Sequence, residues 1–238
     1  MTKTRFTRFH ALGGFFGTAV VLVGLTGTLA HNTAASVAKA ATPSAPAAVV
    51  YSGKTGHVTA GGSTTFHDWA LKSTQIRGSA TLIFPGVTGR PAPALVSLTV
   101  KIPVLSLKSS DTGMEHTAYK RLRHRKFPLI TYVVTSAKLL KTSVTKPAVY
   151  TFSAWGKLIV AGKTRHMTLQ ITVAPAPGGQ LTISTSTKLK MTDFGISPPT
   201  ALLGIIQSSN TVSVQAVCHL TRRKGGKSIR GGTMPPTK

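Results

Sequence analysis

Apolar and polar residues alternate with a period of two along most of the chain beyond residue 50. The clearest runs are VYTFSAWGKLIV at 149–160, RHMTLQITV at 165–173, LTISTSTKL at 181–189 and TVSVQAVCHL at 211–220. Successive side chains of a strand point to opposite faces of its sheet, so this alternation is typical of strands buried on one face. Half-buried strands of this kind indicate an antiparallel sheet.

Further alternating runs lie nearer the N-terminus, at residues 75–84 (QIRGSATLIF), 94–103 (ALVSLTVKIP) and 129–136 (LITYVVTS). In the second of these runs the alternation places Val96 on the apolar face and Leu95 on the opposite face. Turn sequences rich in Gly and Pro separate several of the runs, and the helical pattern that parallel sheets require is absent. We therefore expect an all-β fold of about eight or nine antiparallel strands, forming a barrel or a sandwich.

One segment, SSDTGMEHTAYKRLRHRKFP at 109–128, interrupts the alternation and predicts a short helix between strands. Thr112 and Glu115 stand three residues apart, which is the spacing of a capping box at a helix start. Pro128 stops the segment. An apolar stripe at four-residue steps is formed by Met114, Ala118 and Leu122.

Residues 1–40 are predicted to be a signal peptide. A basic start precedes an uncharged apolar run at 11–30 and a small-x-small cleavage site at Ala38-Lys39-Ala40. The apolar run is also long enough to span a bilayer, so an uncleaved membrane anchor is the alternative. Residues 41–50 are small, polar and proline-containing, which predicts a linker. In either case we expect the rest of the chain to be exported, as a periplasmic or secreted protein.

The charge is strongly one-sided, with 29 Lys and Arg residues against four Asp and Glu residues and a net charge of +25. Such a charge often accompanies nucleic-acid binding, yet no zinc-finger spacing or RNA-binding signature occurs, and most Lys and Arg residues are scattered along the predicted strands. We expect no nucleic-acid partner. Anionic membrane head groups or cell-wall polymers suit an exported protein of this charge better. Residues 222–238 are predicted to form a basic flexible tail.

Three segments together resemble the YceI-like family: LKSSDTGMEHTAYKRLRHRKFPLITY at 107–132, GKLIVAGKTRHMTL at 156–169 and MTDFGISPPTALLG at 191–204. Their order also matches, and the resemblance covers nearly all of a predicted domain at 51–221. It implies an extended, lipocalin-like antiparallel β-barrel whose interior binds a long amphiphilic chain, a polyisoprenoid in the better-known members. The stretch FHDWALKS at 66–73 departs from the family's more usual opening.

The resemblance places the ligand inside the barrel, and the inward faces of the predicted strands include small residues that would leave space for it. An alternative is that facing Phe and Leu side chains fill that space. The candidate ligand-binding residues are His67, Trp69, Ala80, Leu82, Phe152, Ala154, Gly156, Phe194, Leu202 and Leu203.

The stretch KMTDFGISPPTALLG at 190–204 combines a rare carboxylate with two prolines and an apolar run. Ser197 is predicted to cap a short helical turn with Pro198 at its first position. Asp193 is interpreted as a structural corner that accepts backbone N–H groups, and the leucines as a cover over one end of the barrel.

Catalysis is not expected. The single cysteine, Cys218, lies on the apolar face of its strand while His219 lies on the other face, which predicts a buried thiol rather than a nucleophile. No nucleophile elbow, HExxH motif or close carboxylate pair occurs, and we expect no metal site and no cofactor beyond a bound lipid. The leading hypothesis is a secreted or periplasmic carrier or store of an isoprenoid-type amphiphile. The alternative is a non-enzymatic cationic envelope protein that binds anionic cell-surface polymers.

Overall fold

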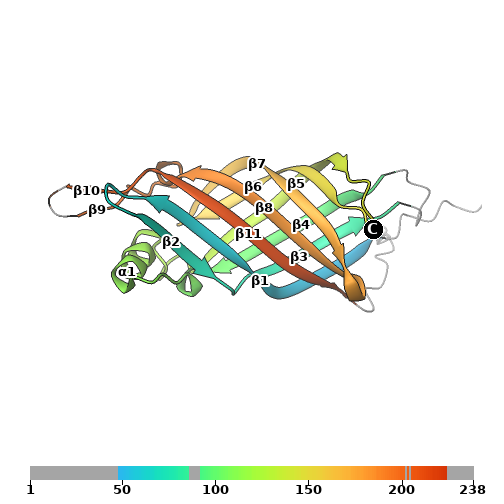
Figure 1. Cartoon of the computed structure of the whole chain (residues 1–238), viewed down its shortest axis with the longest axis horizontal. Helices are drawn as coiled ribbons and strands as arrows, with labels where there is room; N and C mark the ends of the chain where they lie inside the picture. The colour runs from blue at the N-terminus through green and yellow to red at the C-terminus, as the bar shows by residue number, and fades with distance from the viewer. Residues whose placement is uncertain (1–47, 86–91, 202, 204, 224–238) are drawn as a thin grey trace, which may run out of the picture. The chain divides into compact units, whose positions relative to one another are not determined.

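The structure is a computed structural model that describes residues 48–85, 92–201, 203 and 205–223. Eight antiparallel strands form a closed barrel in the order β1-β3-β4-β5-β6-β7-β8-β11, with β11 paired back to β1 (Figure 1). The barrel strands are β1 (Val49–Ser63), β3 (Arg77–Ile83), β4 (Ala94–Pro103), β5 (Leu129–Thr142), β6 (Tyr150–Val160), β7 (Lys163–Ala176), β8 (Gln180–Lys190) and β11 (Thr211–Arg222). The all-β prediction is confirmed, and the sheet closes as a lipocalin-like barrel rather than forming a sandwich.

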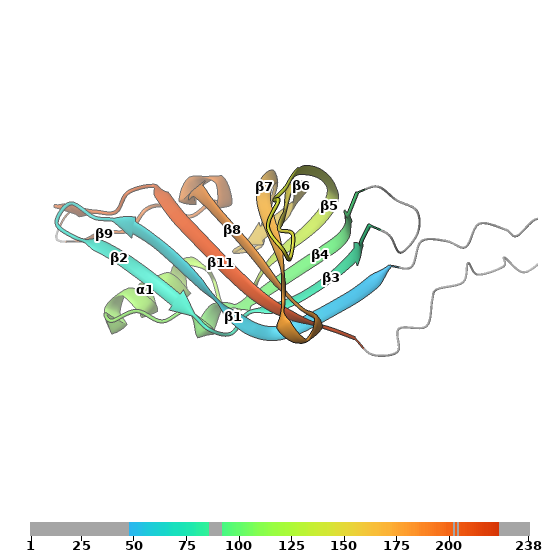
Figure 2. The same cartoon turned by 45° about the vertical axis from the view of Figure 1, so that its right-hand side comes forward.

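Strand β1 is shared between two neighbours. Its first part, from Val49 to Gly53, pairs with β3, and its second part pairs with an additional strand, β2 (Asp68–Ser73). Gly56 lies between the two parts with φ 146°, and a Cβ atom there would stand 2.2 Å from the Val217 carbonyl oxygen. Only glycine therefore permits this bend. Because of it, β2 extends the barrel wall at one end (Figure 2).

The two ends of the barrel differ, and we call them the open end and the closed end. At the open end β5, β7 and β11 begin, and at the closed end β4, β6 and β8 begin. The helix α1 (Thr112–Arg121) and a small hairpin of β9 (Thr200–Ala201) and β10 (Ile206–Gln207) lie at the open end (Figure 1). The described residues also include the short 3-10 segments η1 (Val104–Ser106), η2 (Pro177–Gly179) and η3 (Met191–Phe194).

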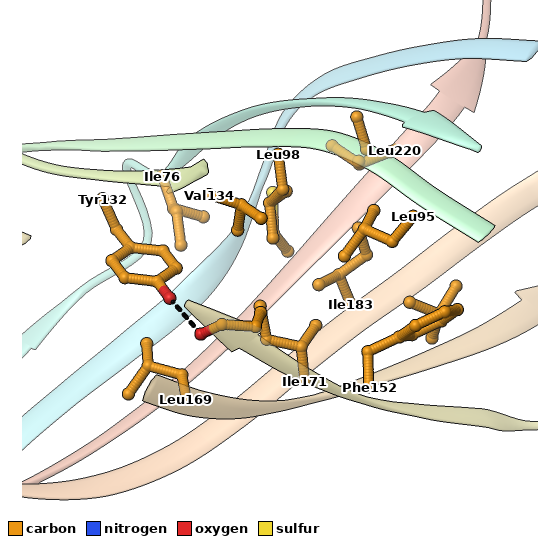
Figure 3. Close-up of a cluster of buried hydrophobic side chains, with 14 of the residues drawn as sticks. Ile76, Leu95, Leu98, Tyr132, Val134, Phe152, Leu169, Ile171, Ile183 and Leu220 are labelled. Atoms are coloured by element: carbon orange, nitrogen blue, oxygen red, sulfur yellow. Dashed lines mark hydrogen bonds between the residues drawn. The ribbon is translucent and has the colours of Figure 1, made fainter. Parts of the chain in front are cut away.

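The half of the barrel toward the closed end is filled by side chains. Phe152 and Val173 are completely buried there, and Tyr51 and Tyr150 both contact Phe84, with ring centroids 6.4 and 6.2 Å apart. Figure 3 shows part of this cluster, including Leu95, Phe152, Ile183 and Leu220. The core therefore lies inside the barrel, along the inward positions that the alternation of β3, β6, β7, β8 and β11 predicted.

Helix α1 begins one residue earlier than the capping-box prediction implied. The Asp111 carboxylate accepts hydrogen bonds from the backbone N–H groups of Gly113 at 2.8 Å and Met114 at 3.3 Å, so Asp111 rather than Thr112 is the N-cap. Glu115 instead accepts from the Ser109 N–H and from the Lys108 ammonium. Those contacts hold the Glu115 side chain against the preceding segment, away from the position of a capping box.

The predicted alternation fails in β4. Leu95 is 4% exposed and Val96 is 51% exposed, the reverse of the expectation. The register between β3 and β4 shifts at this point, with Thr81 opposite Ser97 and Leu82 opposite Leu95. A bulge inserts one unpaired residue and so inverts the alternation beyond it.

The helical turn predicted from Ser197 does not form. The η3 segment ends earlier, at Gly195 with φ 67°, and the chain then runs without helix into β9. Pro198 and Pro199 explain the difference, because a residue that precedes proline is disfavoured in the helical region. Asp193 contributes through its backbone carbonyl, which accepts a hydrogen bond from the Arg165 guanidinium.

The two predicted boundaries of the barrel domain, at residues 51 and 221, lie within strands β1 and β11. Val49 and Val50, in the predicted linker, pair with Leu82 and Thr81 of β3, and Arg222 still belongs to β11. The predicted signal peptide at 1–40, the linker up to residue 47 and the tail from residue 224 lie outside the described residues. Within the part of the chain that is described, no helix is both long enough and apolar enough to span a membrane.

Candidate ligand-binding site

The half of the barrel toward the open end is hollow. It encloses a cavity of about 490 Å³, bounded by the inner faces of the strands and by α1. The inward residues differ between the two halves, because the cavity wall includes Thr185 and Thr187 whereas the filled half is lined by hydrophobic residues.

The floor of the cavity is formed by Tyr132. Its hydroxyl donates a hydrogen bond of 2.9 Å to the Ala154 carbonyl (dashed line in Figure 3). Its ring covers Gly156, where a Cβ atom would lie 2.8 Å from the ring. Burial raises the pKa of Tyr132 to about 12, so the phenol stays neutral and donates this hydrogen bond at any ordinary pH. Ile171 and Ile183 lie beside it and complete the floor.

The long wall of the cavity comes from β8 and β11. Every second residue faces inward, from Ile183 to Leu189 on β8 and from Val212 to Cys218 on β11. Six residue steps along β8 span about 20 Å at the rise of an antiparallel strand. The hydroxyl of Thr185 donates to the Gln170 carbonyl at 2.8 Å, so it presents little unsatisfied polarity to the interior.

Helix α1 supplies a side wall. Its predicted apolar stripe, Met114, Ala118 and Leu122, lines the cavity as expected from the four-residue spacing. The helix is anchored by Tyr119, which is 8% exposed and whose hydroxyl donates to the Leu107 carbonyl at 2.6 Å. Apolar residues therefore surround the interior on the helix side as well.

The rim of the cavity is polar and carries charge. His67 and Trp69 line it near the β1–β2 turn, and the Trp69 indole N–H donates to Ser208 at 3.2 Å. Arg121 and Lys190 bring cationic groups to the rim from two sides. The combination of an apolar interior and a polar, cationic rim suits a ligand with a long apolar chain and a polar or anionic head.

A family model for the YceI-like domain matches residues 51–219. The chain belongs to the YceI-like family. Among solved structures, Burkholderia cenocepacia BcnA is similar with a TM-score of 0.52 and 16% identity, over 69% of this chain and 95% of that one. A polyisoprenoid-binding domain from Saccharophagus degradans, implicated in plant cell wall breakdown, is similar with a TM-score of 0.51 and 12% identity, over 74% of this chain and 99% of that one. At these identities the two likenesses show the shared fold. A search of curated protein sequences finds no match.

The predicted site residues of this YceI-like barrel fall into separate regions. His67 and Trp69 lie on the cavity rim. Phe194 is 5% exposed within the core, Leu203 is fully exposed on the β9–β10 hairpin, and Leu202 lies outside the described residues. Five further predicted residues do not line the cavity but lie in the filled half or under Tyr132: Ala80, Leu82, Phe152, Ala154 and Gly156.

The small residues Ala80, Ala154 and Gly156 were predicted to leave space for a ligand, but other side chains pack over them. Ala80 and Ala154 are at most 1% exposed, and the space above Gly156 is taken by Tyr132. Small inward residues therefore occur in both halves of this YceI-like barrel, because Ala80 and Ala154 lie in packed core whereas Ala60 and Ala216 line the cavity. The alternation of β8 and β11 indicates which of their residues face inward, but not that these residues line a cavity.

The acid–base groups of the barrel are arranged for structure. Cys218 is 2% exposed and burial raises its pKa to about 11, which keeps the thiol protonated. His219 lies on the outer face, 3.2 Å from the Thr182 hydroxyl. Asp111 and Glu115 are engaged at the start of α1. Among the residues that the structure describes, no three His, Cys, Asp or Glu side chains are grouped so that they could hold a metal ion.

Proposed function

We propose that this protein binds a long isoprenoid-type amphiphile, with the apolar chain inside the barrel and the polar head at the open end. The observation that carries the proposal is the hollow, hydrocarbon-lined half of an otherwise filled barrel. Membership of the YceI-like family and the polyisoprenoid-binding domain of the same fold support this ligand class.

The cavity is large enough to provide useful affinity. Burial of each CH2 group contributes about 0.8 kcal/mol, so ten buried carbons contribute about 8 kcal/mol. That corresponds to a dissociation constant of about 1 μM before the cost of ordering the chain is subtracted. Affinity of this order would let the protein hold a lipid and still release it.

We further infer that the role is transport or storage rather than catalysis, in the periplasm or outside the cell. The order of basic, apolar and small residues in 1–40 supports export. The engagement of Asp111 and Glu115 in hydrogen bonds, and the protonated, buried Cys218, support a binding role.

Extraction of the purified protein with organic solvent, followed by mass spectrometry, tests the proposal. We expect the wild type to yield a long-chain lipid. Ala216→Phe, on the cavity wall in β11, should lose that lipid while keeping its melting temperature. Gln215→Phe, on the exposed face of the same strand, is the matched control and should retain it. If the wild type yields no lipid and does not bind an added polyprenyl lipid, the proposal fails.

A second candidate function rests on the charge. The pair Lys108–Glu115, at 3.0 Å, is the only salt bridge within the described ranges, although the chain has 29 basic residues. A cationic envelope protein that binds anionic cell-surface polymers would have such a surface. In that case the wild type should bind an anionic polymer in low salt and release it in high salt, with no lipid in the solvent extract.

A further inference from the structure

Two hairpins at the open end carry exposed apolar side chains at their tips. Phe66, in the turn between β1 and β2, is 67% exposed. Leu203 and Ile205, between β9 and β10, are fully exposed and 64% exposed. Single exposed apolar side chains also occur elsewhere, such as Val144 at the closed end, but here three of them lie on two hairpins of the same end, which points to a partner surface.

The two hairpins are joined to each other beside the cavity mouth. The Thr65 N–H donates to the Gln207 carbonyl at 3.0 Å, and the Gln207 N–H donates to the Thr65 hydroxyl at 3.1 Å. Thr64 and Ser208, which form an isolated bridge between the hairpins, both line the cavity. Figures 1 and 2 both show the hairpins projecting together from the open end. The tips therefore form one apolar edge next to the opening.

The charge of the barrel specifies which surface this edge would meet. Basic side chains around the open end include Lys120, Arg121, Arg123, Arg125, Lys126 and Lys190. All four carboxylates also lie at this end, but two of them, Asp111 and Glu115, are engaged in hydrogen bonds of the α1 start. Because basic residues occur over the rest of the barrel too, charge attracts the whole molecule to an anionic surface, and the apolar edge determines its orientation.

We propose that the open end docks onto a bilayer that contains anionic lipid, with Phe66, Leu203 and Ile205 inserted among the head groups. This inference deepens the proposed function, because it places the cavity mouth against the membrane from which an amphiphile would enter. Hydrocarbon suits the apolar edge, whereas a hydrated anionic polymer would contact only the basic side chains. A second copy of the chain would have to bring its own apolar edge against the first.

Sedimentation with vesicles of phosphatidylcholine and phosphatidylglycerol tests the docking. The full chain carrying Phe66→Ser and Ile205→Ser should bind at least about tenfold more weakly than the wild type, because two large side chains no longer leave water. Val144→Ser is the matched control, since Val144 is a fully exposed apolar side chain in the β5–β6 connection at the closed end. It should bind like the wild type. Equal binding by all three proteins would overturn the proposal.

Tryptophan probes then test which end of the barrel enters the bilayer, and they do so even if another part of the chain also binds the vesicles. In vesicles of lipid brominated on the acyl chains, the added fluorescence of Phe66→Trp should be quenched and that of Val144→Trp should not. Quenching of the Val144→Trp probe alone would overturn the orientation. Sedimentation velocity tests whether the apolar edge binds a second copy of the chain. If the wild type is a dimer and the double variant Phe66→Ser, Ile205→Ser is a monomer, the edge serves self-association and the proposal is overturned.

Failure of docking and failure of lipid binding give different results. Phe66 and Ile205 do not line the cavity, so the double variant should still yield the same extracted lipid as the wild type. Lipid in the extract without vesicle binding would refute docking alone. Vesicle binding through the tips without any extracted or added lipid in the barrel would support docking and refute the proposed cargo.

Discussion

The ring of Tyr132 lies over Gly156, and its hydroxyl donates a hydrogen bond of 2.9 Å to the Ala154 carbonyl. This contact joins the neighbouring strands β5 and β6 inside the barrel, and Tyr132 lines the cavity (Figure 3 shows the hydrogen bond). We expect Tyr132→Phe to lower the free energy of unfolding by about 1 kcal/mol, the usual net value of one hydrogen bond. Urea unfolding measures it. A variant as stable as the wild type would show that the Ala154 carbonyl has another adequate partner.

Overpacking should be tolerated differently along the barrel. Ala80→Phe and Gly156→Phe place a ring where the interior is already full, and we expect each to cost about 1–3 kcal/mol or more. Ala216→Phe enters the cavity instead and should cost much less. Urea unfolding midpoints compare the three variants. Equal losses for all three would mean that the hollow half cannot accept an added side chain.

Alkaline pH should destabilise the fold through buried protonated groups. Burial raises the pKa of Tyr132 from 10.0 to about 12 and that of Cys218 from 9.0 to about 11. The unfolded chain loses these protons first, so the stability is complete below about pH 9 and is lost as the pH rises from there to about 12. Melting temperatures across this range measure the loss. Cys218→Ala should show a smaller decline between about pH 9 and 11, and an equal decline would assign the loss to other groups.

Acid should act mainly through Glu115. The Ser109 N–H and, next, the Lys108 ammonium lower the pKa of this carboxyl below its usual 4.5. Its contribution is therefore present above about pH 4.5 and is lost as the pH falls through the lowered value. We expect a modest decrease in melting temperature in that range, and little pH dependence there for Glu115→Gln. An identical decrease in both proteins would place the acid-sensitive group elsewhere.

The sequence was sufficient to predict the eight strands of the closed barrel and most of their inward faces. A period of two fixes which side chains of β6, β7, β8 and β11 point inward, because the constraint is local to each strand. It fails in β4, where the bulge beside Leu95 inverts the alternation, since one extra residue leaves no compositional trace. The N-cap at Asp111 was missed by one residue, because Thr112 and Glu115 have the three-residue spacing of a capping box.

The position of the cavity along the barrel could not be predicted from alternation. Ala80 and Thr185 both face inward, yet one lies in packed core and the other on the cavity wall. Whether an inward position is covered depends on side chains from other strands, such as Tyr132 of β5, which covers Gly156 of the neighbouring strand β6. The β9–β10 hairpin was also missed, because Pro198 and Pro199 favour extended chain as readily as they begin a helix.

In the proposed function, the buried side chains beyond Tyr132 block passage of the cargo toward the closed end, so the cargo enters and leaves at the open end. A chain held there must leave by reversing the path by which it entered, with the last portion in becoming the first portion out. Donor and acceptor cannot engage the protein together, because both need the same mouth. Exchange between two places then requires the whole molecule to travel from one to the other. The rate of lipid transfer would then depend on the number of protein molecules and on their diffusion, as for a soluble carrier and unlike a continuous channel.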